Sequence, residues 1–141
     1  MVGWGTGSFE NDDAQNFLSR LNSVEVGDLK QMLAKAADQD YVDAPESGAV
    51  IAAAEVVATA RGNPPQAVPS QIAEWVSKIE GAPSSDMSEL ARLAVYKVRT
   101  NSELKDLWLE AEGLNEWSAV LRDLEERLSE GIGSSGDRVI G

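Results

Sequence analysis

Carboxylates supply most of the chemistry that this sequence could perform. The chain of 141 residues contains 24 Asp and Glu residues but no His and no Cys. Without imidazole or thiol groups, Ser-His-Asp and Cys-His catalysis, disulfide bonds and the zinc sites that use these ligands are excluded. An enzyme made from this chain would depend on carboxylates, hydroxyls, Lys or a bound metal. We therefore favour a protein that is not an enzyme.

Glu55 is the most unusual of these carboxylates, because it lies in an otherwise apolar segment. An ionised carboxylate in such a segment is costly unless it is paired. Arg92 and Arg99 share one face of a later segment, and we predict that they supply the guanidinium for a bidentate bridge to Glu55. The alternative is that Glu55 and Glu103 form a pair of carboxylates that holds a metal or shares a proton.

A second group of oxygen ligands lies near the start of the chain, at Glu10, Asp12 and Asp13. Together with Glu55 and Glu103, these residues are the candidate ligands for calcium or magnesium. The spacing is not that of an EF-hand, and adjacent acids at the start of a helix are also favoured by the helix dipole. The helix-dipole interpretation is preferred, so no cofactor is predicted and a divalent cation is the alternative.

Alternating glycines precede this acidic group, and the same stretch carries two aromatic residues, Trp4 and Phe9. Gly-rich loops before helices bind phosphate, but here no strand precedes the loop, no Lys follows it, and the acids would repel a phosphate. We therefore expect an ordered N-terminal loop in which Trp4 and Phe9 pack into the core, with Asn11 or Asp12 capping the first helix.

The rest of the sequence predicts an all-α protein. Residues 45–61 are apolar on every side and predict a central helix, around which six or seven helices form a single compact domain. We expect this domain to span 1–130 and the Gly/Ser-rich residues 131–141 to be a flexible tail.

Local signals predict where several of these helices begin. Asp12 with Gln15, and Asp86 with Glu89, fit capping boxes, and Asn101 is the expected cap of the helix that carries Glu103. In the first turn of that helix, Glu103 gains from the helix dipole, so a structural role is sufficient for it. Aromatic residues on apolar stripes are expected in the core, namely Trp75, Trp108 and Trp117.

The charge of the whole chain limits its partners. The net charge is −12 and the isoelectric point is near 4.3. Such a protein repels nucleic acid and anionic membranes and attracts basic proteins or divalent cations. The start of the sequence has no basic and apolar leader, and no apolar run is long enough to span a bilayer, so a cytoplasmic location is expected.

Two motifs of this sequence resemble those of a known protein family. The opening Trp4-Gly5-Thr6-Gly7-Ser8-Phe9-Glu10-Asn11-Asp12 is similar to W-G-x-G-x-F-x-N-D, and the stretch from Asn101 to Trp108 is similar to an N-S-E-L-x-x-L-W block. Both are features of a bacterial family of small acidic proteins of unknown function. The resemblance implies membership of that family and no particular activity.

Two functions remain open from the sequence. The first is a non-enzymatic interaction module that binds a protein partner, with a basic surface favoured, as immunity or inhibitor proteins do. The second is a divalent-metal-dependent enzyme, such as a hydrolase, with its carboxylates around Glu55 and Glu103.

Overall fold

Helix α3 (Ala44–Ala60) forms the centre of the structure. The structure is a computed structural model that describes the backbone of residues 5–137 and the side chains of residues 5–130. Twelve residues of this helix are buried, and the six other α-helices of the described chain all contact it. Its alanines allow these neighbours to approach closely. The predicted central helix is confirmed, and it begins and ends one residue earlier than 45–61.

The described chain folds into a single compact all-α domain without strands. An isolated parallel bridge joins Val42 to Ser102. The other helices are α1 (Asp12–Ser19), a short 3-10 helix (Leu21–Ser23), α2 (Val26–Asp38), α4 (Ser70–Lys78), α5 (Ser85–Thr100), α6 (Glu103–Glu110) and α7 (Leu114–Asp137).

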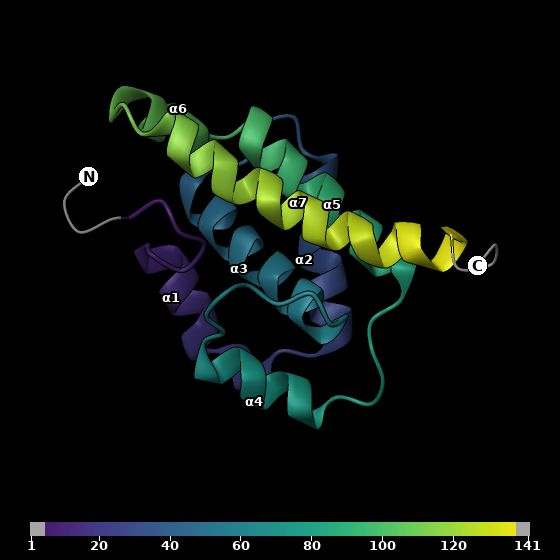
Figure 1. Cartoon of the computed structure of the whole chain (residues 1–141). Helices are drawn as coiled ribbons and strands as arrows, with labels where there is room; N and C mark the ends of the chain where they lie inside the picture. Colours follow the sequence, from purple (N-terminus) through teal and green to yellow (C-terminus); the bar gives the residue numbers. More distant parts are fainter. Residues whose placement is uncertain (1–4, 138–141) are drawn as a thin grey trace.

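The helices surround α3 from several directions. In Figure 1, α7 crosses the molecule above α3, α1 lies to the left of α3, and α4 lies below it. Helices α5 and α7 pack against each other, and α2 packs against both α3 and α5. Three aromatic side chains predicted for the core, Trp75, Trp108 and Trp117, are buried. The polar edge of one of them is satisfied, since Trp75 Nε1 donates to the carbonyl of Val24 at 2.8 Å.

Side-chain caps start several of the helices. Asn11 Oδ1 accepts from the backbone N–H of Ala14 at 2.8 Å and caps α1. The sequence analysis left Asn11 and Asp12 open as the cap, and Asn11 is the one that fills this role. The predicted capping box of Asp12 with Gln15 is therefore wrong. Ser84 caps α5 through the N–H of Met87 at 3.2 Å, in place of the predicted Asp86 box. In both cases the cap lies before the predicted residue, because the helix already includes that residue.

The expected cap of α6 is also corrected, by one residue. Asn101 still belongs to the end of α5, because its N–H donates to the carbonyl of Lys97 at 2.7 Å. Ser102 is the first residue free to cap α6, and its buried Oγ accepts from the N–H of Lys105 at 3.0 Å while donating to the carbonyl of Val98 at 2.6 Å.

We expect Ser102→Ala to lower the free energy of unfolding by about 1–2 kcal/mol, because it removes a helix cap and a buried hydrogen bond. Asn101→Ala is the matched control, and it should change stability by less than about 0.5 kcal/mol because its side chain is exposed. Urea denaturation followed by circular dichroism measures both. A larger loss for Asn101→Ala would contradict the assignment of the cap.

A glycine inside α3 allows α1 to pack against it. A Cβ atom added at Gly48 would lie 2.7 Å from Asn11 Oδ1 and 2.8 Å from the Cβ of Asp13. The start of α1 therefore lies directly on the backbone of α3, and this contact holds the opening loop in place.

We expect Gly48→Ala to destabilise the protein by about 1–2 kcal/mol, since the displaced cap and the crowding outweigh the higher helix propensity of Ala. Gly27→Ala in α2 is the control, because a Cβ there meets nothing within 4 Å. That substitution should stabilise the protein by a few tenths to about 1 kcal/mol. Thermal and urea unfolding of the two variants should therefore shift in opposite directions, and equal shifts would contradict this packing.

The last helix is longer than the sequence indicates. Helix α7 is described to Asp137, whereas 138–141 lie outside the described residues. The flexibility expected for 131–141, and the division of the chain at residue 130, stay predictions. Among the helices of residues 5–137, none is both long enough and apolar enough to cross a membrane.

Candidate functional site

The buried carboxylate of Glu55 is the centre of the candidate site. Glu55 is 1% exposed, and both of its oxygens accept from Arg127 of α7, at 2.8 Å from Nη1 and 3.1 Å from Nη2. This bidentate pair compensates the charge of Glu55 within the core. The sequence predicted the right kind of partner for Glu55 but the wrong arginines.

Arg92 and Arg99, the expected partners, pair with other carboxylates. Arg92 forms two hydrogen bonds with Glu89 on its own helix, at 2.8 and 2.6 Å, and Arg99 forms two with Glu125 of α7, at 2.5 and 3.2 Å. These bonds raise the pKa of both guanidiniums and lower that of Glu89. The prediction failed because these arginines lie at the outer side of the α5–α7 interface rather than facing α3.

Ser8 of the opening loop is the third member of the cluster. Its Oγ donates to Glu55 Oε2 at 2.6 Å, and Ser8 is 8% exposed. The cluster therefore ties the N-terminal loop, the central helix and the last helix to one carboxylate. The sequence analysis did not select Ser8, although the expectation of an ordered loop beside Phe9 pointed to this segment.

Arg127 has further partners that fix its orientation. Its Nε donates to Asp123 Oδ2 at 2.8 Å, and its Nη1 lies 3.4 Å from the carbonyl of Asn63. The amide of Asn63 in turn donates to the carbonyl of Arg127 at 3.0 Å. Burial lowers the pKa of Arg127, but the hydrogen bonds and charges of Glu55 and Asp123 outweigh it, so the pKa lies above its ordinary value.

The sequence analysis did not select Arg127 or Asp123 as site residues. One signal could have separated Arg127 from its neighbours. It follows Leu124 by one helical turn and directly precedes Leu128, two residues that are buried on the inner face of α7. A cation placed beside such a stripe is a candidate for pairing with a buried acid.

Glu103 lies far from Glu55. Its Oε1 accepts from the backbone N–H of Ala44 at 2.8 Å, at the start of α3, while Glu103 itself occupies the first turn of α6. The rise along α3 from Ala44 to Glu55 is roughly 16 Å. The two carboxylates therefore do not share a metal or a proton, and that pairing is corrected.

The acids of the opening segment face their own backbone. Glu10 Oε1 accepts from the N–H of Gly7 at 2.9 Å, and a Cβ added at Gly5 or Gly7 would lie 2.6 or 2.5 Å from the Glu10 carboxylate. The alternating glycines thus make room for a carboxylate rather than for a phosphate. Asp12 and Asp13 lie in the first turn of α1, as the helix-dipole interpretation requires.

Burial, and then the charges of Asp12 and Asp43, raise the pKa of Asp13. Within the described residues, no three Asp or Glu side chains are grouped so that they could hold a metal ion.

Phe9 is partly buried and packs against the core, whereas Trp4 lies outside the described residues. The anchoring role of Trp4 therefore stays a prediction.

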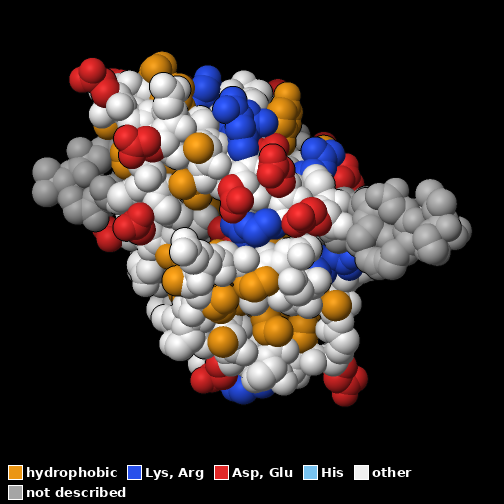
Figure 2. Space-filling view, in the orientation of Figure 1, with side chains coloured by type: hydrophobic (Ala, Val, Ile, Leu, Met, Phe, Trp, Pro, Cys, Tyr) orange, Lys and Arg blue, Asp and Glu red, His pale blue; other side chains and the backbone are white. Residues whose placement is uncertain are grey.

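An open pocket of about 480 Å³ lies over the Glu55 cluster. Phe9, Pro65, Ala67 and Val120 form its apolar walls, and Ser8, Glu55, Asp123 and Arg127 supply its polar groups. Figure 2 shows this side of the molecule, where apolar side chains gather beneath α7 and acidic and basic side chains lie together along it.

The groups that line this pocket indicate what it could contact. A serine nucleophile needs a neighbouring base that is free to accept its proton. Both oxygens of Glu55, the carboxylate that contacts Ser8, already accept hydrogen bonds from Arg127. The exposed carboxylate of Asp123 and the apolar walls are instead suited to contact a ligand.

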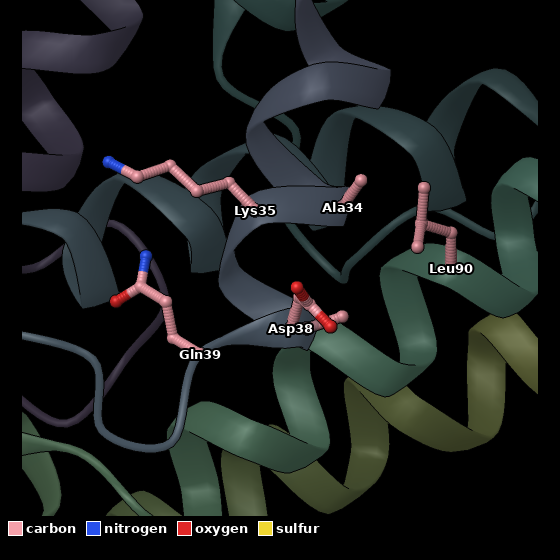
Figure 3. Close-up of a pocket in the computed structure, with 6 residues that line it drawn as sticks. Ala34, Lys35, Asp38, Gln39 and Leu90 are labelled. Atoms are coloured by element: carbon pink, nitrogen blue, oxygen red, sulfur yellow. The ribbon is translucent and has the colours of Figure 1, made fainter.

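A second pocket, of about 650 Å³, lies between α2 and α5 and is lined by Ala34, Lys35, Ala37, Asp38, Gln39 and Leu90. Figure 3 shows Lys35 and Gln39 extending to one side while Leu90 lies on the other. Polar groups therefore do not converge in this pocket, and the Glu55 pocket is the better candidate site.

A family model described as Domain of unknown function (DUF4259) matches residues 3–120. This match covers the opening loop and Glu55, and it ends before Asp123 and Arg127. Neither the curated proteins nor the solved structures include a significant match to the chain. The expectation that the chain belongs to a family of unknown function is thereby confirmed: the chain belongs to the DUF4259 family, a domain of unknown function.

Proposed function

We propose that this protein is a non-enzymatic interaction module that binds a basic protein partner, as immunity and inhibitor proteins do. The observation that carries this proposal is the charge of −12 on a helical domain that also has an open pocket with apolar walls. Charge accelerates the encounter with a basic surface, and the apolar walls supply contact area once the partner is bound.

The internal pairing of the arginines supports the same function. Arg92, Arg99 and Arg127 are each bound to carboxylates of this chain, which reduces their attraction for an anionic ligand. Exposed acids such as Glu110, Glu116 and Glu126 then dominate the surface. The proposal includes a cytoplasmic location. It also includes that the protein binds neither nucleic acid nor a membrane surface.

Affinity capture from the native host, with identification by mass spectrometry, tests this proposal. We expect a basic protein to be enriched at low salt and released as the salt concentration rises, because added ions screen the attraction. An unrelated acidic protein of similar charge is the control for simple ion exchange. If nothing is enriched above that control, the proposal is wrong.

The alternative function, a divalent-metal-dependent enzyme, gains no support from the positions of Glu55 and Glu103. Calorimetric titration with Mg²⁺ and Mn²⁺ separates the two functions. A saturable heat that is lost in Glu55→Gln would favour the alternative, whereas we expect no saturable heat from the intact protein.

A further inference from the structure

We propose that the pocket over Glu55 receives an arginine side chain of the partner, with Asp123 as the carboxylate that binds its guanidinium. This inference rests on the proposed function, because it names the group of a basic partner that the pocket recognises. It is drawn from the charge, the walls and the surroundings of the pocket.

The charges in the pocket leave one negative charge without compensation. Glu55 and Asp123 contribute two negative charges, and Arg127 contributes one positive charge. Glu55 is buried and forms a bidentate pair with Arg127, but the Asp123 side chain is 66% exposed and bonds to Arg127 through Oδ2. The other oxygen of Asp123 has no hydrogen bond within the described chain, so it is available to a cation from outside.

The walls of the pocket suit the stem of an arginine. Phe9, Pro65 and Val120 present apolar surface, against which the methylene groups of a long cationic side chain can pack while the charge stays near the rim. A guanidinium is favoured over an ammonium because it is less strongly hydrated, bonds to a carboxylate through two parallel N–H groups and stacks on aromatic rings.

The surroundings of the pocket favour a basic ligand as well. Phe9 also lines an adjoining pocket, of which Glu10, Asp12 and Gln15 are part. Acids therefore line both of the pockets to which Phe9 contributes. Arg127 is the cation that would oppose an incoming arginine, and its charge is already engaged by Glu55 and Asp123.

The test uses the full chain labelled with ¹⁵N and three small probes at low salt: N-acetyl-arginine methylamide and its citrulline and lysine counterparts. Citrulline has nearly the shape of arginine but no charge. We expect the arginine probe to shift the amide signals of Phe9, Ala67 and Val120, and to bind at least about tenfold more tightly than the citrulline probe. Equal binding of the citrulline or the lysine probe would overturn the assignment to arginine.

Variants test the role of the carboxylate and of the walls. Asp123→Asn should weaken the arginine probe about tenfold, whereas Glu126→Gln, which removes an equal charge from an exposed site on the same helix outside this pocket, should change its affinity less than twofold. Because Asp123 also contacts Arg127, Ala67→Trp serves as a second variant that fills the pocket without changing a charge, and it should abolish binding. Unchanged binding in Ala67→Trp, or equal losses in Asp123→Asn and Glu126→Gln, would refute the proposal.

The same variants separate this inference from the proposed function. If a basic partner is captured equally well by Asp123→Asn, by Ala67→Trp and by the unmodified protein, the pocket is not its binding site and only this inference fails. If capture is lost in both variants but retained in Glu126→Gln, the inference is supported within the complete protein.

Discussion

Arg127→Met should lower the free energy of unfolding by about 3–5 kcal/mol, because it leaves the buried carboxylate of Glu55 without its cation. Ser8 would remain as a hydrogen-bond donor to Glu55, and a single hydroxyl does not replace a bidentate guanidinium. Urea denaturation followed by circular dichroism measures the effect.

Two further variants show whether this loss comes from the uncompensated charge. Arg122→Met removes an exposed arginine from the same helix and should change stability by less than about 0.5 kcal/mol. The double variant Glu55→Met/Arg127→Met removes both charges and should recover most of the stability lost in Arg127→Met. If Arg127→Met costs less than about 1 kcal/mol, or the double variant is no more stable, the pair does not have the role described.

The fold class and the central helix could be predicted because the pattern from Ala44 to Ala60 has one physical solution. A helix that is apolar on every side must be surrounded by others, and all six neighbours contact it. The burial of the three tryptophans followed from the same kind of pattern. These predictions depended on how much apolar surface must be covered, which is a property of the sequence alone.

The partner of Glu55 could not be predicted because it depends on which helix face meets α3. Arg92, Arg99 and Arg127 all lie beside apolar stripes, so the sequence is compatible with each of them as the partner. The packing of α5 and α7 decides between them, since it directs Arg99 to Glu125 and Arg127 to Glu55. A pairing between residues 72 positions apart is determined by tertiary structure, and the apolar stripe beside Arg127 does not by itself identify Glu55 as its partner.

The start of α6 shows the same limit over a shorter distance. Asn101 and Ser102 are adjacent and both are good capping residues. The cap is assigned by a contact with a distant segment, in which Val42 accepts from the N–H of Glu103 at 2.8 Å and donates to the carbonyl of Asn101 at 3.2 Å. This bridge fixes where α5 ends and α6 begins, and nothing near Asn101 in the sequence indicates it.

Trp108→Ala should lower the free energy of unfolding by about 3–5 kcal/mol, because the removal of a buried indole leaves a cavity that the helices around it cannot close. Trp108 and Leu104 are the buried residues of α6, so this short helix loses much of its attachment to α3. The ring also fits against Gly113, where an added Cβ would lie 2.6 Å from its Cε3 atom. A side chain at position 113 would therefore displace the ring or the turn.

Leu109→Ala is the matched control, since Leu109 is the next residue of the same helix and is 56% exposed; it should cost less than about 0.5 kcal/mol. Hydrogen exchange distinguishes a local from a global effect of Trp108→Ala. We expect the amides of α6 to lose protection before those of α3, because α6 has the smaller buried surface. If the two variants are equally stable, Trp108 is not a packing residue, and its place in the N-S-E-L-x-x-L-W block would then point to a role in binding.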